Sequence, residues 1–145
     1  MTRYEIAMQT HRAGFNCCAA QLFAWRDRLG LTEQQCYGLS SGMGGGLRTG
    51  EICGAVSGAV MALGMLVPHD DKTLAEGKAR NAALTKEFQR RFAERFGAVC
   101  CRDLKEKETK YTSEAVSLSG AETSCDKYIV AAVEILEEIL KEEGI

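Results

Sequence analysis

The sequence predicts an all-α fold, a single-domain bundle of about five to six helices that spans residues 1–145. Apolar residues recur at helical spacing along most of the chain, and no segment shows the apolar–polar alternation of a half-buried strand. Pro68 is the only proline, so long helices can run uninterrupted. No linker, internal repeat or low-complexity tract divides the chain, and its length is sufficient for one core.

The first helix is expected over Tyr4–His11, and the second is expected to start after Asn16. The Asn16 side chain can accept a hydrogen bond from the first turn, which makes it a good N-cap. Gly30 is suited to end this helix because glycine adopts the left-handed conformation without strain. Three apolar residues between them are spaced for one buried face: Leu22, Trp25 and Leu29.

Thr32 and Gln35 have the spacing of a capping box, which predicts the start of a third helix. Leu31 and Cys36 flank this box and can close a hydrophobic staple, so we interpret Cys36 as structural. The third helix is expected to end at Gly42, where a glycine cluster begins.

The fourth helix is expected to start around Glu51 and to end before Pro68. Its apolar run, Ile52–Val67, has 16 residues. A membrane-spanning helix needs about 20, so we interpret the run as a buried core helix and the protein as not membrane-spanning. A glycine costs roughly 1 kcal/mol relative to alanine in an exposed helix. We therefore expect another helix to pack closely against Gly54, Gly58 and Gly64.

A long fifth helix is predicted to start at an Asp71 cap and to end at Gly97. Apolar residues at every fourth position mark its buried face: Leu84, Phe88, Phe92 and Phe96. Glutamates interleave with its basic residues, so we interpret the basic side chains as a solvated face. These are Lys78, Arg80, Lys86, Arg90, Arg91 and Arg95.

Residues 104–122 are polar and lack a strong period, so we expect a long loop with local turns. Thr123 and Asp126 then have the spacing of a second capping box, which starts the last helix. One buried face of this helix is predicted from four apolar residues: Ile129, Val133, Leu136 and Leu140.

Composition and charge argue against several classes of function. The net charge of −2 does not favour a nucleic-acid partner or an anionic membrane surface. The first residues lack the basic-then-apolar order of a secretory signal, so we expect a cytoplasmic protein whose thiols stay reduced. Seven cysteines, an odd number, do not suggest a disulfide scaffold. We expect reactive or metal-bound thiols, with some cysteines filling the core.

Three cysteines lie at predicted helix N-termini: Cys17 after the second-helix cap, Cys53 in the first turn of the fourth helix, and Cys125 inside the last capping box. Unpaired backbone N–H groups give a helix start partial positive charge. We therefore expect the pKa of each thiol to fall below about 8.5. The glycine cluster before Cys53 can approach or close around a cofactor. The candidate cofactor-binding residues are Gly44, Gly45 and Gly46.

No two cysteines show C-x-x-C spacing, so any shared site must be assembled by the fold. Two pairs of neighbouring cysteines occur, Cys17–Cys18 and Cys100–Cys101. A disulfide between neighbours strains the intervening peptide, so we do not expect one within either pair. We expect instead that one member of each pair reaches inward. His11 lies a few residues before Cys17, but we interpret it as an exposed surface histidine rather than a proton partner.

Four segments together resemble a family of redox-active proteins, the C_GCAxxG_C_C family, which is recognised by four cysteines and a C-G-A-x-x-G motif. The segments are FNCCAAQLFAW, GMGGGLRTGEICGAVSGAVMALG, RFGAVCCRDL and CDKYIVAAV. Cys53–Gly58 fits the motif without a gap. The resemblance implies that the four family cysteines are Cys17, Cys53, Cys101 and Cys125. Cys17 precedes a small residue, as in the family pattern, and Cys101 begins the Cys-Arg-Asp-Leu block.

The resemblance implies one site in which these four cysteines act in thiol/disulfide chemistry or bind an iron–sulfur cluster for electron transfer. Thiolates gathered in one pocket repel one another, and a metal, a cluster or disulfide formation relieves that repulsion. A domain related to this family is attached to a multihaem cytochrome that has an iron–sulfur centre. This relation favours the hypothesis that the four cysteines bind a cluster. The haem-attachment motif C-x-x-C-H is absent, so covalent haem is not expected.

Two alternative functions stay open. A structural or regulatory module would bind zinc through the same four cysteines, because soft thiolates suit zinc as well as clusters. A transporter-associated interaction protein would have inert core cysteines, and family members are often encoded near transporter genes. The expected partners are a redox partner protein or a small thiol, a transporter, or a second copy of the chain that forms a homodimer.

Overall fold

Eight α-helices and one short π-type turn, η1, build the protein in a computed structural model that describes residues 1–145. The elements are α1 (Arg3–Arg12), α2 (Cys17–Leu29), α3 (Glu33–Ser40), η1 (Gly46–Gly50), α4 (Gly54–Leu66), α5 (Leu74–Phe96), α6 (Cys101–Leu104), α7 (Glu114–Ser119) and α8 (Ser124–Glu143). The all-α class is confirmed, but the predicted count of helices is wrong. The additional elements, η1, α6 and α7, are four to six residues long and too short to show a helical period.

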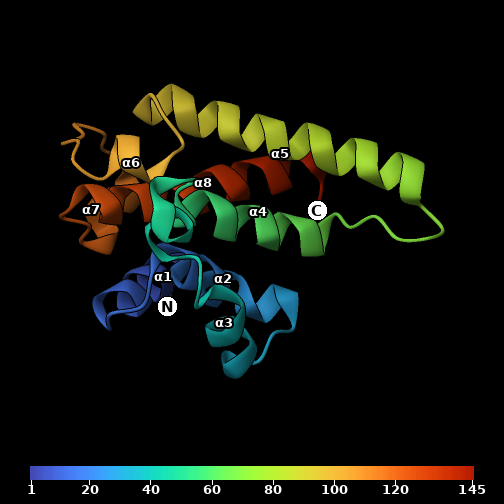
Figure 1. Cartoon of the computed structure of the whole chain (residues 1–145), viewed down its shortest axis with the longest axis horizontal. Coiled ribbons are helices and arrows are strands. Elements are labelled where there is room, and N and C mark those ends of the chain that lie inside the picture. The colour runs from blue at the N-terminus through green and yellow to red at the C-terminus, as the bar shows by residue number, and fades with distance from the viewer.

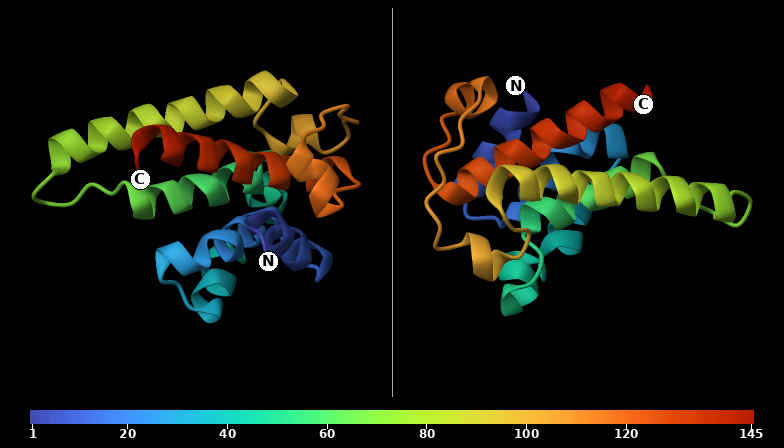
Figure 2. Two further views of the ribbon diagram at one scale, coloured as in Figure 1. Left: turned by 180° about the vertical axis from the view of Figure 1, so that it is seen from behind. Right: turned by 90° about the horizontal axis from the view of Figure 1, so that it is seen from above.

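The long helices α4, α5 and α8 run side by side, with α5 on one side of α4 and α8 and with α1, α2 and α3 on the other (Figures 1 and 2). α8 contacts α1, α2, α4, α5 and α7, and most of its residues are buried. The starts of α4 and α8 lie at the same end of the molecule, together with η1, α6 and α7 (Figure 1). This end therefore gathers segments that are far apart in sequence.

Most of the predicted helix ends are confirmed. Asn16 caps α2, and the capping boxes that begin with Thr32 and Thr123 are both formed, at α3 and α8. Gly30 and Gly97 end α2 and α5 in the left-handed conformation. Local hydrogen-bonding chemistry thus fixes the starts of the two helices that carry Cys17 and Cys125.

The glycines of α4 allow close packing against α2 at two of the three predicted positions. A Cβ added at Gly54 would lie 2.9 Å from the backbone nitrogen of Cys18. One added at Gly58 would lie 2.8 Å from the carbonyl oxygen of Cys18. Gly64 has no such neighbour within 4 Å, so helix packing does not account for it. The close approach brings the first turns of α2 and α4 together.

α5 begins at Leu74, and the predicted Asp71 cap is wrong. The Asp70 carboxylate accepts hydrogen bonds from the N–H groups of Lys72 and Thr73, so a turn forms there before the helix starts. The predicted apolar face is buried at three positions, Phe88, Phe92 and Phe96.

Three basic residues of α5, Arg80, Arg91 and Arg95, form ion pairs with α8, which corrects the interpretation of a solvated basic face. The two shorter pairs are those of Arg91 and Arg95. Arg91 Nη2 lies 2.6 Å from Glu142 Oε2, and Arg95 Nη2 lies 2.8 Å from Glu138 Oε1. Both pairs are partly exposed, so each contributes at most about 1 kcal/mol to the free energy of unfolding. These pairs link α5 to α8.

The segment after Leu104 is more ordered than the predicted loop. It contains α7, whose N-cap Ser113 accepts a hydrogen bond from the N–H of Val116. Val116 is buried against Met8 and Val130. A single buried apolar residue in a six-residue helix gives no periodic signal, so the sequence pattern did not predict this element. No helix is both long and apolar enough to cross a membrane.

Candidate thiol site

A left-handed turn before α4 determines where Cys53 lies. Four consecutive residues, Gly45 to Arg48, have φ between 59° and 62°. A Cβ at Gly46 would clash with the backbone of Glu51, so only glycine fits there. Leu47 and Arg48 hold the same conformation at a cost of about 1–2 kcal/mol each. The glycine cluster thus builds a tight turn, and a cofactor role for Gly44, Gly45 and Gly46 stays a prediction.

A short antiparallel backbone bridge places Cys101 beside Cys53. The N–H of Cys53 donates to the carbonyl oxygen of Val99, with an N···O distance of 2.8 Å. The N–H of Cys101 donates to the carbonyl oxygen of Glu51 at 2.6 Å. The residue before α6 and the residue before α4 are therefore held together through their main chains.

The helix starts bring Cys17 and Cys125 to the same region. Cys17 is the first residue of α2, and a Cβ added at Gly54, the residue after Cys53, would lie 3.2 Å from the Cβ of Cys17. Cys125 is the second residue of α8, inside the Thr123 capping box. Both cysteines are partly exposed and both are free thiols.

The four predicted cysteines lie near enough to one another that neighbouring members of the set act on the ionisation of Cys17 and Cys53. The pKa of Cys17 is raised well above its ordinary value, first by a hydrogen-bonding interaction with Cys125 and then by burial. The charges of Cys53, Cys125 and Cys101 act in the same direction. Charges on Cys101 and Cys125 also raise the pKa of Cys53. We call Cys17, Cys53, Cys101 and Cys125 the thiol group.

Cys125 is the acidic member of the thiol group. The interaction with Cys17 lowers its pKa to about 6, and the charges of His11 and Lys105 act in the same direction. Burial and the Asp126 carboxylate oppose this shift and are outweighed. The lowered pKa favours the thiolate form of Cys125, the form of cysteine that attacks disulfides.

The prediction of a lowered pKa is wrong for the other two cysteines at helix starts. Burial raises the pKa of Cys53 to about 11, although the backbone N–H groups of Ala55 and Val56 oppose the shift. The pKa of Cys17 is raised as well. At Cys53, loss of hydration therefore outweighs the partial charge of a helix N-terminus. Cys53 is also the N-cap of α4, one residue before the predicted first turn.

His11 lies beside Cys125, which corrects its interpretation as a surface histidine without a proton partner. Its Nδ1 lies 3.0 Å from Asp126 Oδ1, and its side chain is 26% exposed. The other carboxylate oxygen of Asp126 accepts hydrogen bonds from the N–H groups of Glu122 and Thr123. His11 and Asp126 are more than 100 residues apart in sequence, so no local pattern links them. The Asp126 carboxylate thus holds an imidazole next to the thiolate.

The three remaining cysteines lie outside the thiol group. Cys18 is buried in the core, where its Sγ donates to Met61 Sδ at 3.8 Å. This is the one hydrogen bond between two sulfur atoms whose distance and angle both lie in the usual range. Cys36 is fully buried, in agreement with a structural role. Cys100 is the N-cap of α6.

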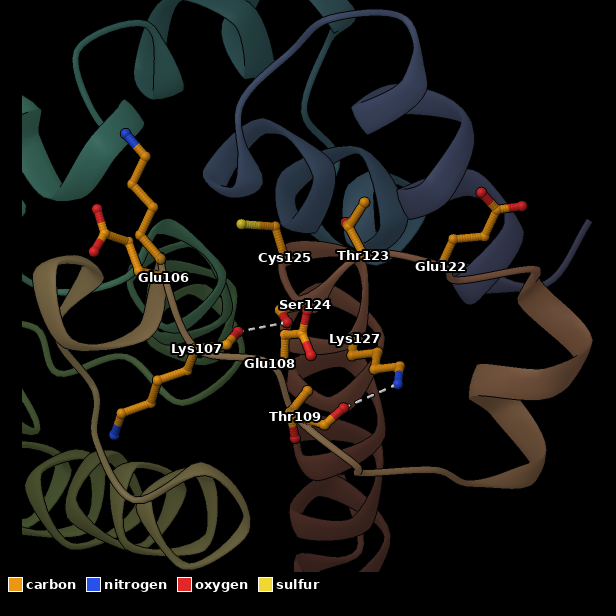
Figure 3. Close-up of a pocket in the computed structure, with 10 residues that line it drawn as sticks. Glu106, Lys107, Glu108, Thr109, Glu122, Thr123, Ser124, Cys125 and Lys127 are labelled. Atoms are coloured by element: carbon orange, nitrogen blue, oxygen red, sulfur yellow. Dashed lines mark hydrogen bonds between the residues drawn. The ribbon is translucent and has the colours of Figure 1, made fainter.

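A polar pocket of about 480 Å³ opens beside Cys125 (Figure 3). Its walls are the start of α8 and the segment of residues 105–109, which carries Glu106 and Lys107. Two hydrogen bonds join the walls: Ser124 Oγ donates to the Lys107 carbonyl oxygen at 2.7 Å, and Lys127 Nζ donates to the Thr109 carbonyl oxygen at 3.2 Å. Sequence reasoning missed this pocket because its two walls are brought together only in the folded chain.

Metal binding by the thiol group was predicted from its donor type. Thiolates suit zinc and iron–sulfur clusters equally well. However, no group of three or more histidine, cysteine, aspartate or glutamate side chains is arranged to hold a metal ion. Binding of zinc or an iron–sulfur cluster by these cysteines therefore stays a prediction.

The fold and the site define a class of protein: an all-helical chain that gathers cysteines from α2, α4, α6 and α8 at one end. The family model described as "Putative redox-active protein (C_GCAxxG_C_C)" matches residues 15–139. The chain therefore belongs to this family, as its motifs predicted. No curated protein and no solved structure matches the chain.

Proposed function

We propose that the protein is a thiol–disulfide oxidoreductase in which Cys125 attacks a substrate disulfide and Cys17 completes the exchange. The observation that carries this proposal is the interaction between the Cys17 and Cys125 thiols, which lowers the pKa of Cys125 and raises that of Cys17. One thiol is then a ready nucleophile while the other keeps its proton. The family description supports a redox role at a coarser level.

The exchange takes place in two steps. The Cys125 thiolate attacks one sulfur of the substrate disulfide, a disulfide between Cys125 and one half of the substrate forms, and the first substrate thiolate leaves. Cys17 then attacks the Cys125 sulfur, and its proton passes to the second substrate thiolate as that group leaves. Two electrons move from the protein to the substrate, which is released as one thiolate and one thiol, and the protein holds a Cys17–Cys125 disulfide. The released thiolate takes a proton from solvent.

The first step makes the second one easier. Before the attack, the interaction with Cys125 is the largest cause of the raised pKa of Cys17. Once the Cys125 sulfur is bonded to the substrate it carries no charge, so Cys17 releases its proton more readily. The order of attack, Cys125 before Cys17, follows from this difference.

His11 has a positioning role in this proposal. Its ring is held by the Asp126 carboxylate at 3.0 Å, and its charge lowers the pKa of Cys125. A protonated imidazole next to a thiolate stabilises the charged form of the sulfur. His11 thereby increases the fraction of Cys125 that can attack, without contact with the substrate.

Disulfide mapping tests the proposal. Protein purified without oxygen is treated with one equivalent of a small disulfide, and its peptides are analysed by mass spectrometry. We expect a Cys17–Cys125 bond in the wild type and a mixed disulfide on Cys125 that persists in Cys17→Ser. Cys18→Ala is the matched control, because this neighbouring thiol lies in the core against Met61, and it should form the bond as the wild type does.

Two outcomes would contradict the proposal. One is a Cys53–Cys101 bond with Cys125 unmodified. The other is stoichiometric iron or zinc in the anaerobic protein, with all four thiols protected from alkylation. That result would favour a four-cysteine metal centre, for which the gathering of Cys17, Cys53, Cys101 and Cys125 is the supporting observation.

A further inference from the structure

The pocket beside Cys125 is lined by charged side chains of both signs. Its ten lining residues include a single apolar one, Cys125 itself. Three lysines and three glutamates lie around it: Lys105, Lys107, Lys127, Glu106, Glu108 and Glu122. The volume of about 480 Å³ lies in the range of pockets that hold small organic ligands.

None of these six charged side chains forms an ion pair within the protein. The ammonium group of Lys127 donates to the backbone carbonyl of Thr109, which fixes its direction and leaves its charge without a carboxylate partner (Figure 3). Lys105 lies close enough to Cys125 to stabilise its thiolate. Lysines and glutamates without ion-pair partners therefore line the pocket that Cys125 also lines.

We infer that the substrate disulfide is a small zwitterionic molecule, built from amino-acid or short-peptide thiols that carry both carboxylate and ammonium groups. This inference rests on the proposed function of Cys125. The carboxylates of such a disulfide pair with Lys105 and Lys127, and its ammonium groups pair with glutamates such as Glu106. The substrate sulfur is thereby held next to the Cys125 thiolate, and the exchange continues as described above.

The other pocket near the thiol group does not fit this role. It has a volume of about 370 Å³ and is mainly apolar, with Met43, Leu47, Ile52, Val60 and Met61 among its lining residues. No cysteine lines it, and Cys125 in particular does not. An apolar disulfide bound there has no thiol within the pocket to attack, so we assign the substrate to the charged pocket.

Oxidation rates with four small disulfides test the inference. The reduced protein is mixed with L-cystine, which is zwitterionic, cystamine, which is cationic, dithiodiglycolate, which is anionic, and bis(2-hydroxyethyl) disulfide, which is neutral. Each rate is divided by the rate of the same disulfide with a free small thiol, so that differences between leaving groups cancel. We expect the highest ratio for L-cystine.

Three variants assign the selectivity to the pocket. Lys105→Gln should slow the reaction with L-cystine and dithiodiglycolate by about two- to fivefold relative to the neutral disulfide, as for an exposed ion pair. Glu106→Gln should slow the reactions with L-cystine and cystamine by a similar factor. Lys110→Gln is the matched control, because Lys110 is exposed in the same segment but does not line the pocket.

The outcomes separate this inference from the proposed function. Equal ratios for all four disulfides, or a ratio for dithiodiglycolate or cystamine as high as that for L-cystine, would overturn the zwitterionic substrate. The Cys17–Cys125 bond would still form in each case, so the proposed function would stand. If none of the four disulfides produces that bond, the proposed function fails and the inference fails with it.

Discussion

At the residue scale, Cys53 and Cys125 differ in ionisation although both lie at helix starts. The backbone N–H groups of α4 act on Cys53, but burial prevails and its pKa rises to about 11. Cys125 is partly exposed and has Cys17, His11 and Lys105 nearby, so its pKa falls to about 6. Position on a helix is therefore a weaker determinant of thiol chemistry than hydration and neighbouring side chains.

The pH dependence of Cys125 alkylation follows from this environment. A lowered pKa means that the reactive thiolate is lost only as the pH falls through about 6, whereas an ordinary cysteine loses it near 8.5. We expect the rate with iodoacetamide, located on Cys125 by mass spectrometry, to rise with pH to a plateau with its midpoint near 6. In Cys17→Ser the midpoint should change, because the largest cause of the shift involves the Cys17 thiol. A wild-type midpoint above 8 would refute the assignment of Cys125 as the thiolate.

His11→Ala is expected to raise the midpoint of the same profile. The variant removes an imidazole whose charge favours the Cys125 thiolate, so a higher pH is needed to deprotonate the sulfur. His69→Ala is the matched control, because His69 is exposed in the connection between α4 and α5. A positioning role predicts this change in the pH profile together with unchanged thermal unfolding. An unchanged midpoint in His11→Ala would show that the imidazole does not act on Cys125.

At the element scale, capping chemistry and glycine placement determine where helices begin and how closely they pack. The Asn16, Thr32 and Thr123 caps could be predicted because each depends on residues within three positions. The left-handed turn over residues 45–48 could not, since Leu47 and Arg48 adopt a conformation that their own side chains disfavour. A hydrogen bond from the N–H of Glu51 to the Gly46 carbonyl oxygen closes this turn, and no local propensity describes it.

A pair of glycine variants in α4 tests the close approach to α2. Gly58→Ala should lower the free energy of unfolding by about 1–3 kcal/mol, because the new Cβ is forced against the Cys18 backbone and Gln21. Gly64→Ala lies in the same helix with open space around it, so it should raise the free energy of unfolding by about 0.5–1 kcal/mol. Urea unfolding measures both. Equal effects of the two variants would mean that α2 and α4 do not meet at Gly58.

At the scale of the whole molecule, the thiol group joins the two ends of the chain. Cys17 lies at the start of α2 and Cys125 at the start of α8, with more than 100 residues between them. The four cysteines could be predicted from the family motifs, because each motif is a local string. The partners that make Cys125 acidic could not be predicted, because His11 and Lys105 reach it from α1 and from the segment after α6.

Oxidation is therefore expected to stabilise the fold. A Cys17–Cys125 disulfide closes a loop of more than 100 residues, for which the loss of entropy in the unfolded chain amounts to about 4–5 kcal/mol. We expect the oxidised protein to unfold at higher urea concentration than the reduced protein. Cys17→Ser, treated with the same oxidant, serves as the control and should show no such increase. An oxidised form less stable than the reduced form would mean that the bond distorts the native helices.

The backbone bridge between the segments before α4 and α6 has a consequence for the redox cycle. The backbone N–H groups of Cys53 and Cys101 are hydrogen-bonded to Val99 and Glu51, although neither residue lies inside a long helix, so we expect them to exchange slowly with deuterium. If Cys17 and Cys125 exchange electrons as proposed, this slow exchange should be the same in the reduced and the oxidised protein, because the bridge holds the main chain around Cys53 and Cys101 in place.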